Sequence, residues 1–211
     1  GLAALDYLLN SGTPDEIIAR FSGEANVNRR VYTSAVANAI YREIHTVVKS
    51  WTGPYRQQFI DRSGTDAGSS VSLLFNYMNI GYELLKNYKV ALPLGKRAGQ
   101  TAAEPTKVEC FYAGASLSLA RAQFDAAVDL WYGRTPAGDT FPSFRSYLKT
   151  VPNGERLISD TETQIAAVEN AFTTLGTNTP LSTLVSTNPT SVEPLYTELQ
   201  KLTRFWKSEL S

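Results

Sequence analysis

The sequence predicts an all-α protein in which antiparallel helices form one or more bundles. Apolar residues recur at spacings of three and four along most of the 211 residues, and no stretch alternates apolar and polar residues long enough to make a strand. Loops that contain Gly and Pro separate these periodic segments. Hydrophobic residues make up 43% of the chain, which is enough to bury a core in one medium domain or two small bundles.

The first two helices are expected to be short. The opening stretch GLAALDYLLN places leucines on one helical face from the start and sets Asp6 among them, with an end between residues 10 and 12. The next helix begins with a capping box, in which Thr13 is the cap, Pro14 takes the first helical position and Glu16 lies three residues past the cap. This second helix is expected to end near Phe21.

The remaining helices are expected where helical periodicity runs between breaks. They cover about 26–51, 55–60, 67–88, 106–132, 143–150, 154–175 and 191–210, with a further turn beginning at Pro180. Gly53 and Pro54 stop the helix at 26–51, whose apolar stripe should pack against neighbouring helices. The main irregular connections are expected at 92–105 and 133–143, where Gly and Pro are frequent.

Composition and charge exclude several functions. Lys plus Arg and Asp plus Glu each number 20, so no general positive field attracts nucleic acid, and no apolar run is long enough to be a transmembrane segment. His45 is the single histidine and Cys110 the single cysteine, which excludes an internal disulfide and a conventional zinc-protease site. No P-loop, dinucleotide fingerprint or Gly-x-Ser-x-Gly motif occurs.

Polar residues at helical spacing are the remaining candidates for a binding site. Two lines of them are Glu109, Ser116 and Gln123, and Asn76, Asn79 and Glu83. If the two lines face each other, they make a buried polar seam; a solvated helix face would produce the same pattern. Arg30 either delivers a guanidinium into such a seam or is an exposed charge.

Five sequence blocks follow one another over nearly the whole chain. They are GLAALDYLLN, Arg30 with YTSAVANAIYREIHTVVKSW, LLFNYMNIGYELLKNYKVALPLGK, VECFYAGASLSLARAQFDAAVDLWYG and LYTELQKLTRFWKSEL. Their order and spacing resemble the imelysin-like family, also called insulin-cleaving membrane proteases. The resemblance implies two helical bundles related by duplication, an exported location in bacteria as a periplasmic protein or outer-membrane lipoprotein, and a role linked to iron uptake.

The resemblance also implies a signature, Gly-x-His-x-x-Glu, that is proposed to hold a metal or ligand between the bundles. In this chain it falls on Gly1, Ala3 and Asp6. Alanine cannot ligate a metal, whereas the shorter acid can still accept hydrogen bonds in a polar pocket. The signature would lie in the middle of a full-length family member, so we expect the chain, residues 1–211, to be the C-terminal part of the fold, with an upstream bundle missing.

These observations lead to three functional hypotheses. The first is a non-enzymatic, exported binding protein with a polar pocket formed by Asp6, Arg30, Asn76, Glu83, Glu109 and Ser116, which would bind a small ligand, iron or another divalent metal. The second is a metallopeptidase of the insulin-cleaving type, an activity that conflicts with Ala3 at the histidine position. The third is a structural or interaction module without a pocket.

Overall fold

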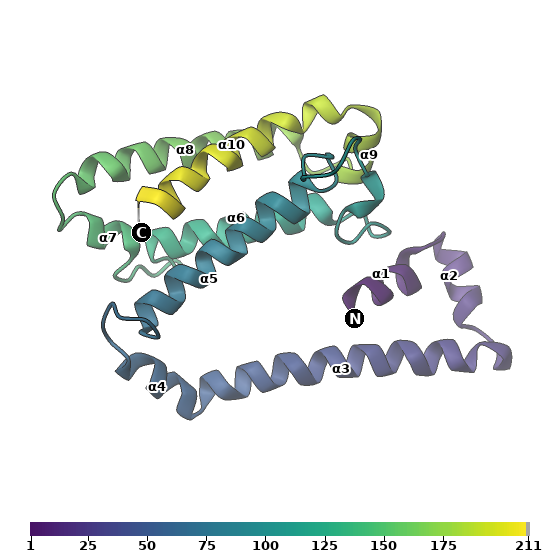
Figure 1. Ribbon diagram of the computed structural model, residues 1–211. Helices are drawn as coiled ribbons and strands as arrows, with labels where there is room; N and C mark the ends of the chain where they lie inside the picture. Colours follow the sequence, from purple (N-terminus) through teal and green to yellow (C-terminus); the bar gives the residue numbers. More distant parts are fainter. Residues whose placement is uncertain (210–211) are drawn as a thin grey trace. The chain divides into compact units, whose positions relative to one another are not determined.

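The computed structural model describes residues 1–209, and side chains as far as residue 207, and this part of the chain is all-α and contains no strand. The α-helices of the described part are α1 (Leu2–Asn10), α2 (Pro14–Phe21), α3 (Val27–Thr52), α4 (Pro54–Asp61), α5 (Ser70–Leu84), α6 (Ser116–Tyr132), α7 (Phe144–Leu148), α8 (Gly154–Leu175), α9 (Leu181–Thr187) and α10 (Glu193–Thr203). Short 3-10 turns lie at Glu24–Asn26, Pro105–Lys107 and Pro189–Ser191, and π-helical segments at Leu85–Ala91 and Arg204–Glu209. The predicted fold class is therefore confirmed (Figure 1).

The N-terminal unit comprises residues 1–75 together with 110–113. In it, α1 packs against α2 and α3, and α3 packs against α4. The predicted capping box is confirmed, because the Thr13 hydroxyl accepts from the Glu16 backbone N–H and the Glu16 carboxylate accepts from the Thr13 N–H at 2.9 Å. Arg30 donates to the carbonyls of Phe21 and Gly23, both at 2.8 Å, and so holds the turn between α2 and α3.

The C-terminal unit comprises residues 76–109 and the chain from residue 114 onward. It is a helical bundle in which α10 packs against α8 and against the π-helical segment 85–91, and α6 packs against that segment, α7 and α9. Its core contains large, fully buried side chains, among them Trp131, Trp206, Tyr82, Phe124 and Leu199. Burial of these aromatic and aliphatic side chains supplies the main stabilisation of the bundle.

The helix predicted at 106–132 is ten residues shorter than expected. After the turn at Pro105–Lys107 the chain stays irregular up to residue 115, with Cys110 at φ +48° and Gly114 at φ +68°. These left-handed conformations interrupt a helix, so α6 begins only at Ser116. The prediction that Glu109 and Ser116 share one face of a helix was therefore wrong, because Glu109 lies outside α6. The helix predicted at 191–210 is α10 followed by the π-helical segment to 209, and residue 210 lies outside the described residues.

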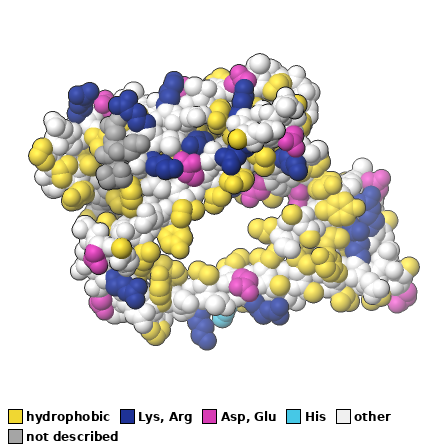
Figure 2. All heavy atoms as spheres, viewed as in Figure 1, with side chains coloured by type: hydrophobic (Ala, Val, Ile, Leu, Met, Phe, Trp, Pro, Cys, Tyr) yellow, Lys and Arg dark blue, Asp and Glu magenta, His cyan; other side chains and the backbone are white. Residues whose placement is uncertain are grey.

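The apolar stripe of α3 also differs from the expectation. No residue of α3 is buried, although the sequence predicted that its stripe would pack against neighbouring helices. Every residue from 41 to 52 is exposed. Figure 2 shows hydrophobic side chains along this helix and at its junction with α4.

Candidate functional site

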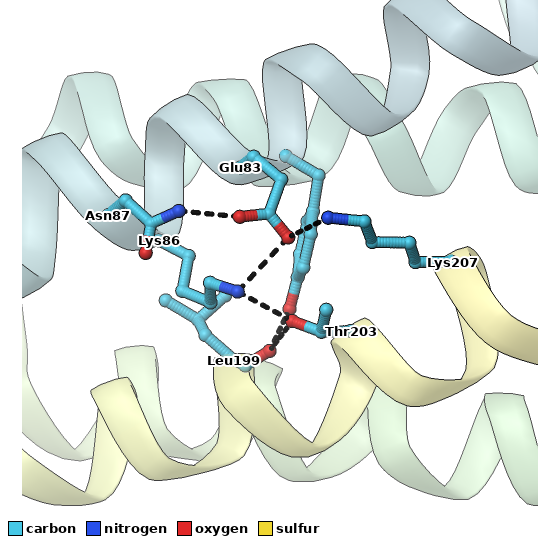
Figure 3. Close-up of polar contacts among 7 residues, drawn as sticks. Glu83, Lys86, Asn87, Leu199, Thr203 and Lys207 are labelled. Atoms are coloured by element: carbon cyan, nitrogen blue, oxygen red, sulfur yellow. Dashed lines mark hydrogen bonds and ion pairs between the residues drawn. The ribbon is translucent and has the colours of Figure 1, made fainter.

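A cluster of charged and polar side chains joins α5 to α10 inside the C-terminal unit (Figure 3). The Lys86 ammonium donates to Glu83 Oε1 at 3.1 Å and to Thr203 Oγ1 at 3.0 Å. Asn87 donates to the other carboxylate oxygen of Glu83, and Lys207 Nζ lies 3.6 Å from Glu83 Oε1. We call these five residues the Glu83 cluster; a carboxylate at its centre is shared by two ammonium groups and an amide.

Helical geometry places the members of this cluster. Glu83, Lys86 and Asn87 are three and four residues apart, which puts them on one face where α5 passes into the π-helical segment 85–91. Thr203 is the last residue of α10 and precedes the second π-helical segment. Two π-helical segments thus adjoin one polar cluster, and such irregular helical segments are frequent at functional sites.

Burial distinguishes the cluster from ordinary surface ion pairs. The side chain of Lys86 is only 9% exposed and that of Glu83 is 26% exposed, whereas Lys207 is largely exposed. A lysine is rarely buried to this degree without a partner, because removing its charge from water is costly. The cluster therefore has a buried end at Lys86 and an end open to solvent at Lys207.

The electrostatics of the cluster favour the ionised carboxylate. Burial acts to raise the pKa of Glu83, but the hydrogen bond and charge of Lys86, the charge of Lys207 and the hydrogen bond from Asn87 outweigh it and hold that pKa below its ordinary value. Beside it, burial raises the pKa of the Tyr82 phenol well above its ordinary value. Tyr82 therefore remains protonated and donates its hydroxyl to the Leu199 carbonyl.

Asp6 has a different environment, within the N-terminal unit. Its carboxylate is almost fully buried and accepts the backbone N–H of Tyr112 at 3.0 Å and that of Ala113 at 2.9 Å, one on each oxygen. The Tyr7 ring packs edge-on against the Tyr112 ring at 5.2 Å. Asp6 therefore ties α1 to the irregular segment 110–113, more than a hundred residues away in the sequence.

The other predicted site residues have separate environments. Arg30 binds the carbonyls of the turn before α3, Asn76 is exposed on α5, and Glu109 is exposed and pairs with Lys89 at 2.6 Å. Ser116 is buried at the first position of α6, and its hydroxyl has no hydrogen-bond partner in the described part of the chain. Of the six predicted residues, Glu83 alone belongs to the Glu83 cluster.

The sequence analysis did not identify the other four members of the Glu83 cluster, Lys86, Asn87, Thr203 and Lys207, as site residues. The i, i+3 spacing of Glu83 and Lys86 is a readable signal for an ion pair on one helix. Thr203 has no such signal, because it lies 117 positions from Lys86 and meets it only through the packing of α10.

A separate cavity of about 410 Å³ lies between α6 and α8. Its lining is mostly apolar and includes Leu117, Arg121 and Phe172, and none of the six predicted site residues lines it. Arg121 pairs with Asp125 at 2.7 Å, and its guanidinium lies 5.7 Å from the centre of the Phe172 ring. The charge of Arg121, the cationic residue in the lining of this cavity, is therefore already paired with Asp125.

The positions that correspond to the family signature do not fit a metal ion. Ala3 offers no donor atom, and each carboxylate oxygen of Asp6 already accepts a backbone N–H. Within residues 1–209 no group of three or more His, Cys, Asp or Glu side chains is arranged to hold a metal ion. A stable site for a divalent cation requires several such ligands.

The fold and these sites define an all-α protein whose helical bundle holds a partly buried, charge-paired cluster. Residues 1–204 match the peptidase M75 family, described as imelysin, so the chain belongs to the imelysin family. No curated protein and no solved structure matches the chain. Among residues 1–209, none of the helices has the length and apolar character needed to span a membrane.

Proposed function

We propose that this chain is an exported, non-catalytic binding protein of the imelysin family, linked to iron uptake, in which the signature helix serves the fold and not metal chemistry. The observation that carries the proposal is the carboxylate of Asp6, which accepts two backbone N–H groups of segment 110–113. A peptidase or a metal carrier of this family would need ligands at the signature positions, where this chain has Ala3.

The Glu83 cluster is the proposed contact for the ligand. It is the place where one of the predicted site residues is surrounded by further polar side chains, and its Lys207 end is open to solvent. Two ammonium groups around one carboxylate leave a net positive charge, which favours an anionic ligand such as a carboxylate chelate of iron. We retain Arg30, Asn76, Glu109 and Ser116 as further candidate contacts.

The test compares free metal with an anionic iron chelate. Calorimetric titrations use ferric citrate, citrate alone and Zn²⁺ as probes on the wild type, Lys207→Met and Asp6→Ala proteins. We expect ferric citrate to bind the wild type, Lys207→Met to weaken that binding by about tenfold, and Zn²⁺ to remain below stoichiometric binding. Lys49→Met, which changes an exposed lysine on α3, is the matched control and should bind like the wild type.

Two results would contradict the proposal. Stoichiometric binding of free Zn²⁺ by the wild type that is lost in Asp6→Ala would make Asp6 a metal ligand. Cleavage of insulin by the purified wild-type protein, abolished by a chelator, would identify a metallopeptidase.

A further inference from the structure

The cavity between α6 and α8 has the size of a small-molecule site. Its volume is about 410 Å³, which lies within the range of ligand pockets. All the residues that line it belong to the C-terminal unit, so that unit alone forms its walls. An apolar cavity of about 150 Å³ accommodates benzene, so this larger cavity has room for two fused rings with a substituent.

Most of the wall of this cavity is apolar. Leu117 and Phe172, both buried in the bundle, contribute side chains from α6 and α8. The hydroxyls of Ser118 and Thr173 also line it, but they donate to main-chain carbonyls of the preceding turn at 2.8 Å and 2.9 Å. Their hydrogens are therefore already used, and a ligand that fits this wall is apolar over most of its surface.

Arg121 and Asp125 provide the charged groups of the lining. Arg121 donates through Nε to Asp125 Oδ1 at 2.7 Å. Among the described residues, the two terminal nitrogens of Arg121 and Oδ2 of Asp125 have no hydrogen-bond partner. The pair thus presents free donors beside a free acceptor and carries no net charge.

The position of the Arg121 guanidinium favours a planar aromatic ligand. It lies 5.7 Å from the centre of the Phe172 ring, so a flat cationic group and an aromatic ring meet at the same wall. Guanidinium groups and aromatic rings both stack on the faces of other aromatic rings. An aromatic ligand can therefore fill the apolar space while its substituent reaches the Arg121–Asp125 pair.

We propose that this cavity binds a neutral aromatic compound that carries a primary amide. The amide carbonyl accepts from the terminal nitrogens of Arg121, and the amide N–H donates to Oδ2 of Asp125. An anionic ligand would be repelled by Asp125, and a cationic ligand by Arg121, so the paired charges select against both. The site is independent of the Glu83 cluster, because no member of that cluster lines the cavity.

The experiment titrates the full chain with two ligands of the same shape and follows backbone amides by NMR. Indole carboxamide should shift the amides of residues 117–125 and 172–177 of the wild type, with a Kd below about 1 mM. Indole carboxylate, which differs in its negative charge, should bind about tenfold more weakly.

Asp125→Asn tests the role of the charged pair. The substitution leaves the Arg121 charge without its carboxylate, so the preference should reverse and indole carboxylate should bind about tenfold more tightly than the carboxamide. The fold should be retained, because an ion pair one turn apart on an exposed part of a helix contributes little to stability.

Thr173→Trp tests the place of binding, because it adds an indole side chain to the wall of the cavity and should weaken binding of the carboxamide at least about tenfold. Thr174→Trp is the matched control, since Thr174 is the next exposed residue of α8 and does not line the cavity, and it should bind like the wild type. Circular dichroism checks that the variants fold.

Three results would overturn the proposal. A wild type whose amides do not respond to about 2 mM indole carboxamide has no site for this class of ligand. Thr173→Trp that binds as tightly as Thr174→Trp would place the ligand elsewhere. Asp125→Asn that still prefers the carboxamide would show that the Arg121–Asp125 pair does not select the ligand.

Discussion

Replacement of Asp6 by alanine should release the segment 110–113 from α1. The substitution removes both acceptors and leaves the N–H groups of Tyr112 and Ala113 without their partners. A hydrogen bond to a charged group contributes about 1.5–3 kcal/mol, so the two together predict a loss of about 3 kcal/mol. The loss should be close to the full value because Asp6 is only 8% exposed, and water does not easily replace the carboxylate.

Asp6→Asn separates the loss of the acceptors from the loss of volume. Asparagine keeps one carbonyl oxygen, but its amide group faces the second backbone N–H with another donor. We therefore expect a loss of about 2 kcal/mol, smaller than that of Asp6→Ala although the shape is preserved. Glu43→Ala, which removes an exposed carboxylate of α3, is the control and should change stability by less than about 0.5 kcal/mol.

The assay is hydrogen exchange of individual amides combined with urea unfolding. In Asp6→Ala the amides of Tyr112 and Ala113 should exchange about 100-fold faster, which corresponds to about 3 kcal/mol. If these two amides exchange at the wild-type rate while the protein stays folded, the carboxylate does not hold the segment and the reasoning fails. Unchanged urea midpoints in both Asp6 variants would also contradict the role of the Asp6 carboxylate in holding the segment 110–113.

Three further outcomes follow from the C-terminal unit. Glu83→Gln should cost about 1 kcal/mol at pH 7. The folded pKa of Glu83 lies below its ordinary value, so this contribution is complete above the ordinary pKa of about 4.3 and disappears as the pH falls through the folded pKa. The urea midpoints of variant and wild type should therefore converge as the pH is lowered below that range. Gly95→Ala should cost about 2 kcal/mol or more in urea unfolding, because Gly95 has φ +72° and a Cβ there would lie 2.3 Å from the Ala102 carbonyl oxygen. Gly99→Ala, at φ +86° in open space, should cost about 1 kcal/mol and isolates the effect of the clash. Leu199→Ala should lower the free energy of unfolding by about 3 kcal/mol, since the side chain is fully buried.

Part of the fold is readable from local sequence because helix formation is a local process. The period of apolar residues identified the segments that became α3, α5, α8 and α10, and the capping box at Thr13 marked the start of α2. The wrong start of the helix predicted at 106–132 also comes from the local sequence pattern. Residues 106–115 have an apolar pattern compatible with a helix, but Cys110 adopts a positive φ.

The environments of the candidate residues depend on contacts that are distant in the sequence. The signature positions Ala3 and Asp6 were recognisable from the blocks of the sequence, and the absence of a histidine there required no structure. That Asp6 binds the backbone of residues 112 and 113 could not be inferred, because one partner is in α1 and the other follows an irregular turn. A side-chain pattern does not encode which backbone N–H groups lack a partner.

The sequence by itself determined the helical class, most helix positions and the membership of the imelysin family, because periodicity, caps and the order of blocks are properties of neighbouring residues. Tertiary structure alone decided that Lys86 is buried between Glu83 and Thr203, and that every residue of α3 from 41 onward is exposed. Both depend on which helices pack together, and packing is set by the sum of many weak contacts between residues far apart in the chain.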